Sequence, residues 1–252
     1  MVLKRLLKRM ADPQPEYAVP PGERVYAIGD IHGRRDLLDQ LLDRIADDDR
    51  ARGPAATTLI FLGDLIDRGP DSAGVVARVK EVATGPMRVR MLLGNHEEVF
   101  LKALGGDRQA LRFLVRIGGR STIISYGIPP AEYDGMDFDT LGARLGKQVP
   151  DEDIAFLKGF EDQIRIGDYL FVHAGIRPRV ALDQQSGSDL RWIRGDFLDY
   201  RGDHGCMIVH GHTITEAVDE QPNRIGIDTG AFASDRLTAL GLEGRQRWYL
   251  ST

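Results

Sequence analysis

The sequence predicts an α/β protein in which helices cover a β-sheet, and three observations support this. Short runs rich in Val, Ile, Leu and Phe recur along the chain, and runs of this kind are typical of buried strands. Stretches with apolar residues at helical spacing lie between the early runs. The resulting order of strand, helix, strand, helix and strand is the βαβ pattern, which builds a sheet flanked by helices.

Each element has a local signal. The first expected helix carries leucines and Ile45 on one face and stops before Gly53-Pro54, and the second covers 75–82 and stops before Gly85-Pro86. Residues 97–167 are expected to be mostly helical. Each apolar run ends in Gly, Asp, Asn or His. The expected strands are 24–30, 58–64, 89–95, 168–175, 206–212 and 224–230.

Residues 23–252 are expected to form one domain, because no repeat, low-complexity run or long linker interrupts them. Residues 1–22 form an N-terminal extension. Its start, MVLKRLLKRM, is too short and too interrupted by Lys and Arg to be a signal peptide or a membrane span. This basic stretch fits a frayed helix or tail, and the alternative is a contact with a membrane surface or a partner.

The composition is ordinary for a soluble protein, with 42% hydrophobic and 28% charged residues. A net charge of −5 gives the whole chain no attraction to nucleic acid or anionic membranes. The single cysteine, Cys206, rules out an internal disulfide and a Cys-based zinc cluster. We therefore expect a cytoplasmic protein without a membrane span or a nucleic-acid partner, and the sequence indicates no oligomeric state.

Polar residues gather at the ends of the expected strands. Five of the six histidines lie at or just beyond an apolar run, and His204 is the exception. In open α/β sheets, ligands bind outside the carboxyl ends of the strands. We therefore expect these polar residues to converge at one edge of the sheet. They are Asp30, His32, Asp64, Asn95, His96, His173, His210 and His212.

This set of side chains suits metal ions. Oxygen and imidazole ligands without thiolate fit Mn²⁺, Fe or Zn²⁺. The candidates exceed what one catalytic ion needs while keeping an open position, so we predict two ions bridged by one carboxylate. Such a pair generates a hydroxide at neutral pH and is suited to in-line attack on phosphorus.

Five motifs carry this polar edge: GDIHG at 29–33, GDLIDRG at 63–69, GNHE at 94–97, HAG at 173–175 and HGHT at 210–213. In this order and spacing they resemble the phosphoprotein phosphatase (PPP) branch of the calcineurin-like metallophosphoesterases, in its compact bacterial or phage form. The resemblance implies a central two-layer β-sandwich flanked by helices, with a βαβαβ core that carries the first three motifs. It also implies a serine/threonine protein phosphatase with two divalent ions, most readily Mn²⁺, and Fe or Zn²⁺ as alternatives.

The same resemblance implies the metal ligands. The first ion would be held by Asp30, His32 and Asp64. The second would be held by Asp64, Asn95, His173 and His212, so Asp64 would bridge the two.

The remaining motif residues are implied to act on the substrate. His96 would protonate the leaving group as the general acid, and Asp67 would hold the His96 ring by a hydrogen bond. Arg68 would bind phosphate oxygens as a fork-shaped donor, with Asn95 beside it. Arg194 matches the second phosphate-binding arginine best, with Arg191 as the competitor.

Three further residues are less constrained. His210 would either support the metal ligands or simply be buried. Asp228 has a counterpart near the site in the family and would support the site rather than bind metal directly. His204 is expected to be an exposed loop residue.

Three functions follow from these motifs. The leading expectation is a phosphatase that acts on phosphoprotein or phosphopeptide, because GNHE and the pair Asp67 and Arg68 favour cleavage of phosphomonoesters. The alternative is a hydrolase of dinucleoside polyphosphates or other small phosphoesters, with a nucleotide as substrate. The third is a phosphate-sensing module without catalysis. Substrate preference is expected to depend on residues 105–165, where no motif is found.

Overall fold

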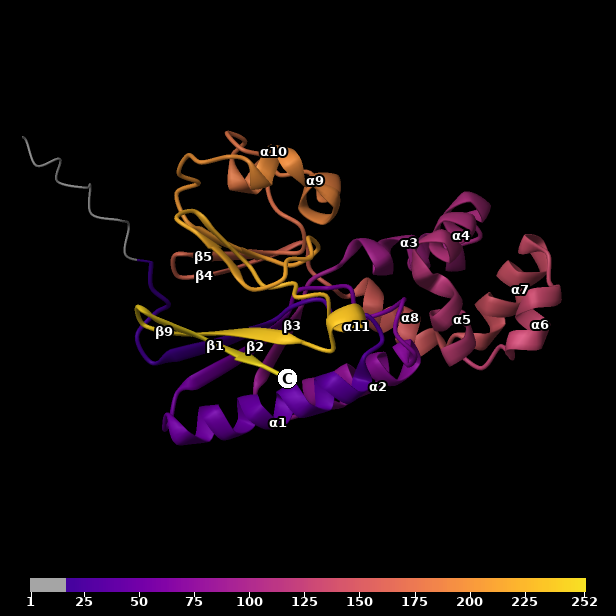
Figure 1. Ribbon diagram of the computed structural model, residues 1–252, viewed down its shortest axis with the longest axis horizontal. Helices are drawn as coiled ribbons and strands as arrows, with labels where there is room; N and C mark the ends of the chain where they lie inside the picture. Colours follow the sequence, from indigo (N-terminus) through magenta and orange to yellow (C-terminus); the bar gives the residue numbers. More distant parts are fainter. Residues whose placement is uncertain (1–16) are drawn as a thin grey trace, which may run out of the picture.

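Two five-stranded β-sheets, with helices on their outer faces, form the core of the computed structural model, which describes residues 17–252 (Figure 1). The first sheet has the strand order β10-β9-β1-β2-β3, and the second has the order β4-β5-β6-β8-β7. This sandwich confirms the predicted α/β fold class. The expectations for the basic first ten residues fall outside the described part of the chain.

The first sheet is mixed. Its central strands β1, β2 and β3 run parallel, and β9 pairs antiparallel with both β1 and β10. The apolar runs predict the parallel strands, whereas nothing in the sequence pattern singled out the last two. The strands are β1 (Glu23–Ile28), β2 (Ala56–Phe61), β3 (Arg88–Met91), β9 (Thr238–Glu243) and β10 (Gln246–Ser251).

The second sheet repeats this arrangement, because β5, β6 and β8 run parallel while β4 and β7 pair antiparallel at the edges. The three parallel strands coincide with predicted apolar runs, and the two edge strands were not predicted. The strands are β4 (Gln163–Ile166), β5 (Tyr169–Val172), β6 (Met207–His210), β7 (Asp219–Gln221) and β8 (Arg224–Gly226).

Helices cover both outer faces and one end of the sandwich. The crossover helices α1 (Arg35–Ala51) and α2 (Ser72–Ala83) lie under the first sheet, and α9 (Gly187–Trp192) and α10 (Gly195–Leu198) lie over the second (Figure 1). Short helices include η1 (Val115–Gly119), η2 (Leu182–Gln184) and α11 (Ala231–Ser234). The expected helical middle is present at the right of Figure 1 as α3 (Asn95–Leu104), α4 (Arg108–Leu114), α5 (Arg120–Ser125), α6 (Pro130–Gly135), α7 (Phe138–Gln148) and α8 (Asp151–Lys158). Within residues 17–252, none of the helices combines the length and the apolar character needed to cross a bilayer.

Strand alternation explains why the central strands are apolar on both sides. On β1, Val25 and Ala27 point between the sheets and pack with residues of the second sheet such as Phe171. Tyr26 and Ile28 point the other way, into the core formed with the crossover helices. Successive side chains of a strand alternate between faces, so a strand buried on both faces reads as a continuous apolar run.

Part of the predicted N-terminal extension packs against the sandwich. Tyr17 and Val19 are buried in the core between the sheets. The backbone N–H of Val19 donates to the carbonyl of Gly244, and that of Ala18 donates to the carboxylate of Asp168. The domain boundary at residue 23 stays a prediction, and residues 17–22 belong to the packed structure.

Arg24 is a fully buried charge at the start of β1. Its Nε donates to Glu243 on β9 at 2.9 Å, and its Nη1 donates to the Asp49 carboxylate at 2.8 Å. The same Nη1 reaches the Asp49 and Gly53 carbonyls at the end of α1, each at 3.0 Å. Arg24 thus ties β1, β9 and the end of α1 together.

We predict that Arg24→Ala lowers the free energy of unfolding by about 3 kcal/mol, because it leaves the partner carboxylates and carbonyls without their donor. Chemical denaturation measures the change. Arg50→Ala is the matched control, since Arg50 and its partner Asp47 on the same helix are each 76% exposed and should contribute little. An Arg24→Ala variant as stable as the control would contradict the prediction.

Candidate active site

The predicted polar residues converge where the parallel strands end. The segments that follow β1, β2, β3, β5 and β6 carry them, with Asn95 and His96 in the first turn of α3, as expected for ligands at the carboxyl ends of parallel strands. All are buried, with exposed fractions of 8% or less. The residues brought together are Asp30, His32, Asp64, Asn95, His96, His173 and His212.

Asp64 lies between two groups of possible metal ligands. His32 and His96 stand on one side of it, and His173 and His212 stand on the other. Its Oδ2 is 3.6 Å from His32 Nε2 and 3.5 Å from His173 Nε2. This position between the groups is the one that a bridging carboxylate needs.

The histidine hydrogen bonds leave lone pairs facing the centre of the site. His32 Nδ1 donates to the Ile66 carbonyl and His173 Nδ1 donates to the Leu62 carbonyl, each at 2.8 Å. Burial lowers the pKa of His32 to about 3 and also lowers the pKa of His173 and His212. The rings are therefore neutral, and neutral imidazole with its other nitrogen hydrogen-bonded is the form that ligates metals.

Several buried polar atoms in the site have no hydrogen-bond partner and are available as metal ligands. Nε2 of His32, Nε2 of His212 and Oδ2 of Asp228 are buried without one. The lone pairs of His173 Nε2 and Asn95 Oδ1 face each other at 3.0 Å. Because buried polar atoms are normally paired, these residues fit divalent ions.

Asp30 adds negative charge beside this group. Its carboxylate accepts the backbone N–H of His212 at 3.0 Å. Burial raises the pKa of Asp30 well above its usual range, and the neighbouring carboxylates of Asp228 and Asp64 raise it further. Carboxylates gathered in a buried space repel one another unless cations neutralise them. Asp228 thus lies where a supporting residue was expected.

His96 and Asp67 form the expected pair. His96 Nδ1 donates to Asp67 Oδ2 at 2.6 Å. Burial disfavours the charged ring, but Asp64 and Asp67 outweigh it, so the pKa of His96 is raised. Asp67 is itself fixed, because its Oδ1 accepts the Thr122 hydroxyl at 2.5 Å and its N–H donates to Ser72 Oγ at 2.9 Å. Thr122 and Ser72 were not among the predicted site residues.

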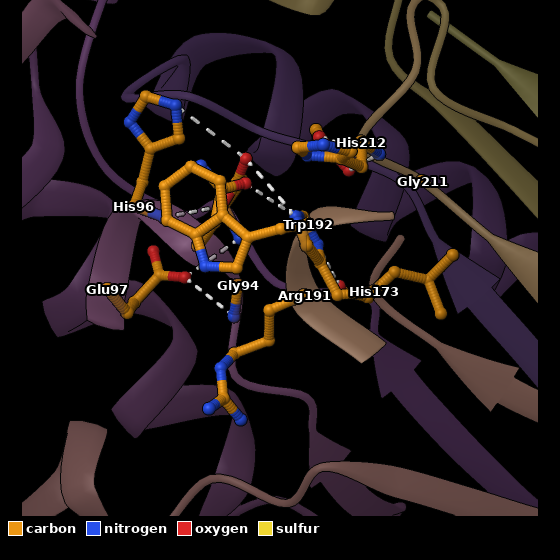
Figure 2. A network of polar contacts seen from close by, with 12 residues as sticks. Gly94, His96, Glu97, His173, Arg191, Trp192, Gly211 and His212 are labelled. Atoms are coloured by element: carbon orange, nitrogen blue, oxygen red, sulfur yellow. Dashed lines mark hydrogen bonds and ion pairs between the residues drawn. The ribbon is translucent and has the colours of Figure 1, made fainter. Parts of the chain in front are cut away.

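The three candidate arginines differ in the side chains that they contact. Arg68 Nη2 donates to His96 Nε2 at 3.2 Å. Arg194 is exposed, with Nη1 3.4 Å from the hydroxyl of Thr213. Arg191 instead binds the carboxylates of Glu98 and Asp162, and Figure 2 shows its guanidinium turned away from the site histidines. Of the two competing arginines, the geometry favours Arg194.

Trp192 stands at the edge of the site, in front of the histidines in Figure 2. Its indole N–H donates to Glu98 Oε2 at 2.8 Å, and its ring meets the His212 ring edge-on at 6.5 Å between centroids. The tryptophan therefore covers the side of the site on which His212 lies.

Strained backbone surrounds the candidate ligands. Among the described non-glycine residues, seven have positive φ, a conformation that is uncommon outside glycine. Five of them belong to the site motifs, a clustering that is characteristic of functional sites. These are His32, Asp64, Asp67, Arg68 and His212, with φ between 48° and 72°.

Glu97, the last residue of the GNHE motif, holds this strained backbone in place (Figure 2). Its buried carboxylate accepts the N–H groups of Asp64, Leu65 and Ile66 at 2.9, 2.8 and 3.3 Å. It also accepts the N–H of Gly94 at 3.1 Å. Glu97 was not among the predicted site residues, and its place in the GNHE motif was the one signal for it.

His210 and His204 lie apart from the ligands. The His210 ring packs edge-on against Phe197 at 5.1 Å, and its Nε2 is 3.5 Å from Arg224 Nη1. Of the two readings for His210, the geometry supports a buried residue. His204 is half-buried between Phe197 and Tyr200, so the expected full exposure is wrong, because aromatic neighbours cover its loop.

The model of the calcineurin-like phosphoesterases matches residues 23–236. The chain belongs to this family. A "Bis(5'-nucleosyl)-tetraphosphatase, symmetrical" of Ralstonia nicotianae is 31% identical over 231 residues, which cover 88% of this chain and 64% of that protein. An Acidovorax sp. protein of the same name is 32% identical, with 71% and 49% covered. The chain thus spans about half to two thirds of the length of these relatives.

A third relative and a solved structure extend the comparison. The "Bis(5'-nucleosyl)-tetraphosphatase PrpE [asymmetrical]" of Anoxybacillus flavithermus is 28% identical, with 84% of this chain and 88% of that protein covered. A crystal structure described as a candidate diadenosine tetraphosphatase has a TM-score of 0.64 at 24% identity, covering 93% of this chain and 98% of that one. At this identity the structural likeness supports the family fold alone.

We predict that Asp64→Asn loses bound metal, because it removes the carboxylate between the two ligand groups. Asp67→Asn should keep the metal and lose rate by about 10²-fold, since it frees the His96 ring. Metal analysis of the purified variants, with turnover of an aryl phosphate, separates the two roles. Equal metal loss in both variants would show that Asp64 and Asp67 do not have these different roles.

Proposed function

We propose that the protein is a phosphohydrolase with two divalent ions and that its substrate is a dinucleoside polyphosphate. The observation that carries the substrate class is the similarity to the Ralstonia nicotianae relative, which extends over 88% of this chain. Hydrolysis of dinucleoside polyphosphates was the alternative function that followed from the sequence motifs. Those motifs favoured a protein phosphatase, whereas the curated relatives described above are named for nucleotide hydrolysis.

The two ions, which we propose to be Mn²⁺ with Fe or Zn²⁺ as alternatives, would divide the ligands in the way that the family resemblance implies. Asp30, His32 and Asp64 would hold one, and Asp64, Asn95, His173 and His212 would hold the other. When bound, they supply a hydroxide nucleophile at neutral pH and offset the charge of the phosphoryl oxygens.

The remaining side chains act on the substrate. Arg68 donates to His96, and Arg194 contacts Thr213, the residue after His212; both arginines would donate to phosphate oxygens. Asn95 would add a side-chain contact. When phosphate takes up the donors of Arg68, His96 Nε2 would be free to bind a proton, which the raised pKa of the ring favours, and to pass it to the leaving oxygen, while Asp67 keeps the ring oriented.

A phosphoprotein or phosphopeptide is the second candidate substrate, and the pair of His96 and Asp67 favours it. A serine or threonine alkoxide is a poor leaving group and needs a proton, whereas the phosphate oxygen of a nucleotide leaves more easily. His96, held by the Asp67 carboxylate at 2.6 Å, would supply the proton that cleavage of a phosphomonoester requires.

The deciding experiment compares kcat/KM for diadenosine tetraphosphate and for a phosphoserine peptide, with manganese-loaded enzyme in both assays. We predict a value at least about tenfold higher for the dinucleotide, because the substrate named for the relatives should be preferred. Chelation should abolish turnover and Mn²⁺ should restore it. A preference for the peptide would make phosphoprotein the first candidate substrate and the dinucleoside polyphosphate the second. If the protein turned over neither substrate, a phosphate-sensing module without catalysis would be the remaining function.

We predict that His96→Asn retains metal and loses about 10²-fold or more in rate for an alkyl phosphate, but much less for a nitrophenyl phosphate. The physical reason is that only the poor leaving group needs a proton. A series of phosphate esters with graded leaving groups measures the effect. Equal losses across the series would remove His96 from the role of general acid.

A further inference from the structure

A cleft of about 660 Å³ opens beside the candidate active site. Its walls are the start of α1, the turn that carries Arg68, and the helix α11, which Figure 1 shows close to that end of the sheet. Arg68 and Phe232 belong to both the cleft and the site. Arg68 donates to His96, and the Phe232 ring meets the His32 ring edge-on at 5.5 Å between centroids.

The charges around the cleft are mostly paired. Arg34 binds the carboxylates of Asp36 and Asp235, and Asp71 caps α2 by accepting the N–H of Gly74. The pairing of Arg34 therefore leaves little net charge on that wall. A negatively charged ligand in this cleft must therefore be bound by arginines other than Arg34.

Arg35 and Arg68 supply that positive charge. The Arg35 side chain is 40% exposed, with its Nε 3.4 Å from Asp39. Asp39 also binds Arg78, at the shorter distance of 2.7 Å, and Arg35 Nη1 lies 3.5 Å from the Gly74 carbonyl, so Arg35 shares its carboxylate and keeps a further donor for a ligand. Arg68 lines the cleft and donates to His96. Of these two cationic groups, Arg68 is the one that borders the active site.

Phe232 supplies a flat apolar wall. It is half-buried, and the Arg68 guanidinium lies 4.7 Å from its ring centroid. An aromatic ring beside an arginine is the combination on which nucleobases stack, since every base has a π-face and the arginine adds a cation–π contribution. The cleft volume also falls in the range of small-molecule sites.

We infer that this cleft binds one nucleoside arm of a dinucleoside polyphosphate, with the base against Phe232 and the phosphates on Arg68 and Arg35. This inference rests on the proposed function and adds the place where the substrate class is recognised. A substrate without a nucleoside would have no base to place against the Phe232 ring.

The test compares two substrates in each variant. Phe232→Leu and Arg35→Gln should lower the ratio of kcat/KM for diadenosine tetraphosphate to that for p-nitrophenyl phosphate by about tenfold, the loss expected for one stacked base or one phosphate contact. Phe232→Tyr, which keeps the ring, should restore the ratio. Arg50→Gln, at the far end of the same helix as Arg35, should leave it unchanged.

A binding measurement separates the nucleoside from its phosphates. Fluorescence anisotropy of etheno-ADP with the manganese-loaded protein should give a Kd about tenfold higher for Phe232→Leu than for the wild type. Competition by inorganic pyrophosphate should be the same for both proteins, since pyrophosphate has no base. A variant that weakens pyrophosphate and etheno-ADP equally would show that Phe232 shapes the site without contacting a base, and would overturn the inference.

The outcomes also separate this inference from the proposed function. Wild-type protein that turns over p-nitrophenyl phosphate but not diadenosine tetraphosphate would overturn both. Wild-type protein that turns over the dinucleotide, with an unchanged ratio in Phe232→Leu and Arg35→Gln, would leave the proposed function standing and remove the cleft from substrate recognition.

Discussion

The carboxylate of Glu97 accepts backbone N–H groups from the turn after β2 and from Gly94, and the shape of the candidate site depends on these bonds. Strained residues of this kind cost about 1–3 kcal/mol each, and the turn contains three of them, Asp64, Asp67 and Arg68. Burial raises the pKa of Glu97 to about 8, and a typical hydrogen bond contributes about 0.5–1.5 kcal/mol, so the bonds that Glu97 accepts offset part of the strain. Gly94 matters here because a Cβ at this position would lie 2.2 Å from Asp64 Oδ1.

Burial then sets the chemistry of the side chains gathered around this turn. The same desolvation that lowers the pKa of His32 and His173 raises that of Asp30. The result is a group of neutral imidazoles with free lone pairs beside mutually repelling carboxylates, which cations among them would stabilise. His96 differs from the other rings because Asp67 stabilises its charged form.

The motifs and the relatives point to different substrates, and the structure suggests why. In the proposed function, Asp64, His96 and Arg68 would act on the reacting phosphate, and that phosphate is common to proteins and nucleotides. Recognition of the rest of the substrate would then fall largely to residues outside the motifs. Residues 105–165 were expected to hold this preference, whereas the cleft that borders the site is lined by residues such as Arg35 and Phe232 as well as by Arg68. The further inference places the choice of substrate class in this cleft.

The sequence by itself determined the parallel strands and the residues that gather at their ends, because apolar runs mark buried strands and parallel strands end at a common edge. It did not determine β4, β7 or β10, which lie at sheet edges where burial is incomplete. It also did not determine β9, although that strand is buried and lies between β1 and β10. Only the tertiary structure decided that Arg191 is bound by Glu98 and Asp162, that His210 packs on Phe197, and that Phe232 lies beneath Arg68. These contacts join different helices, strands and turns of the chain. Their partners are fixed by how the two sheets and their helices pack, which local periodicity does not encode.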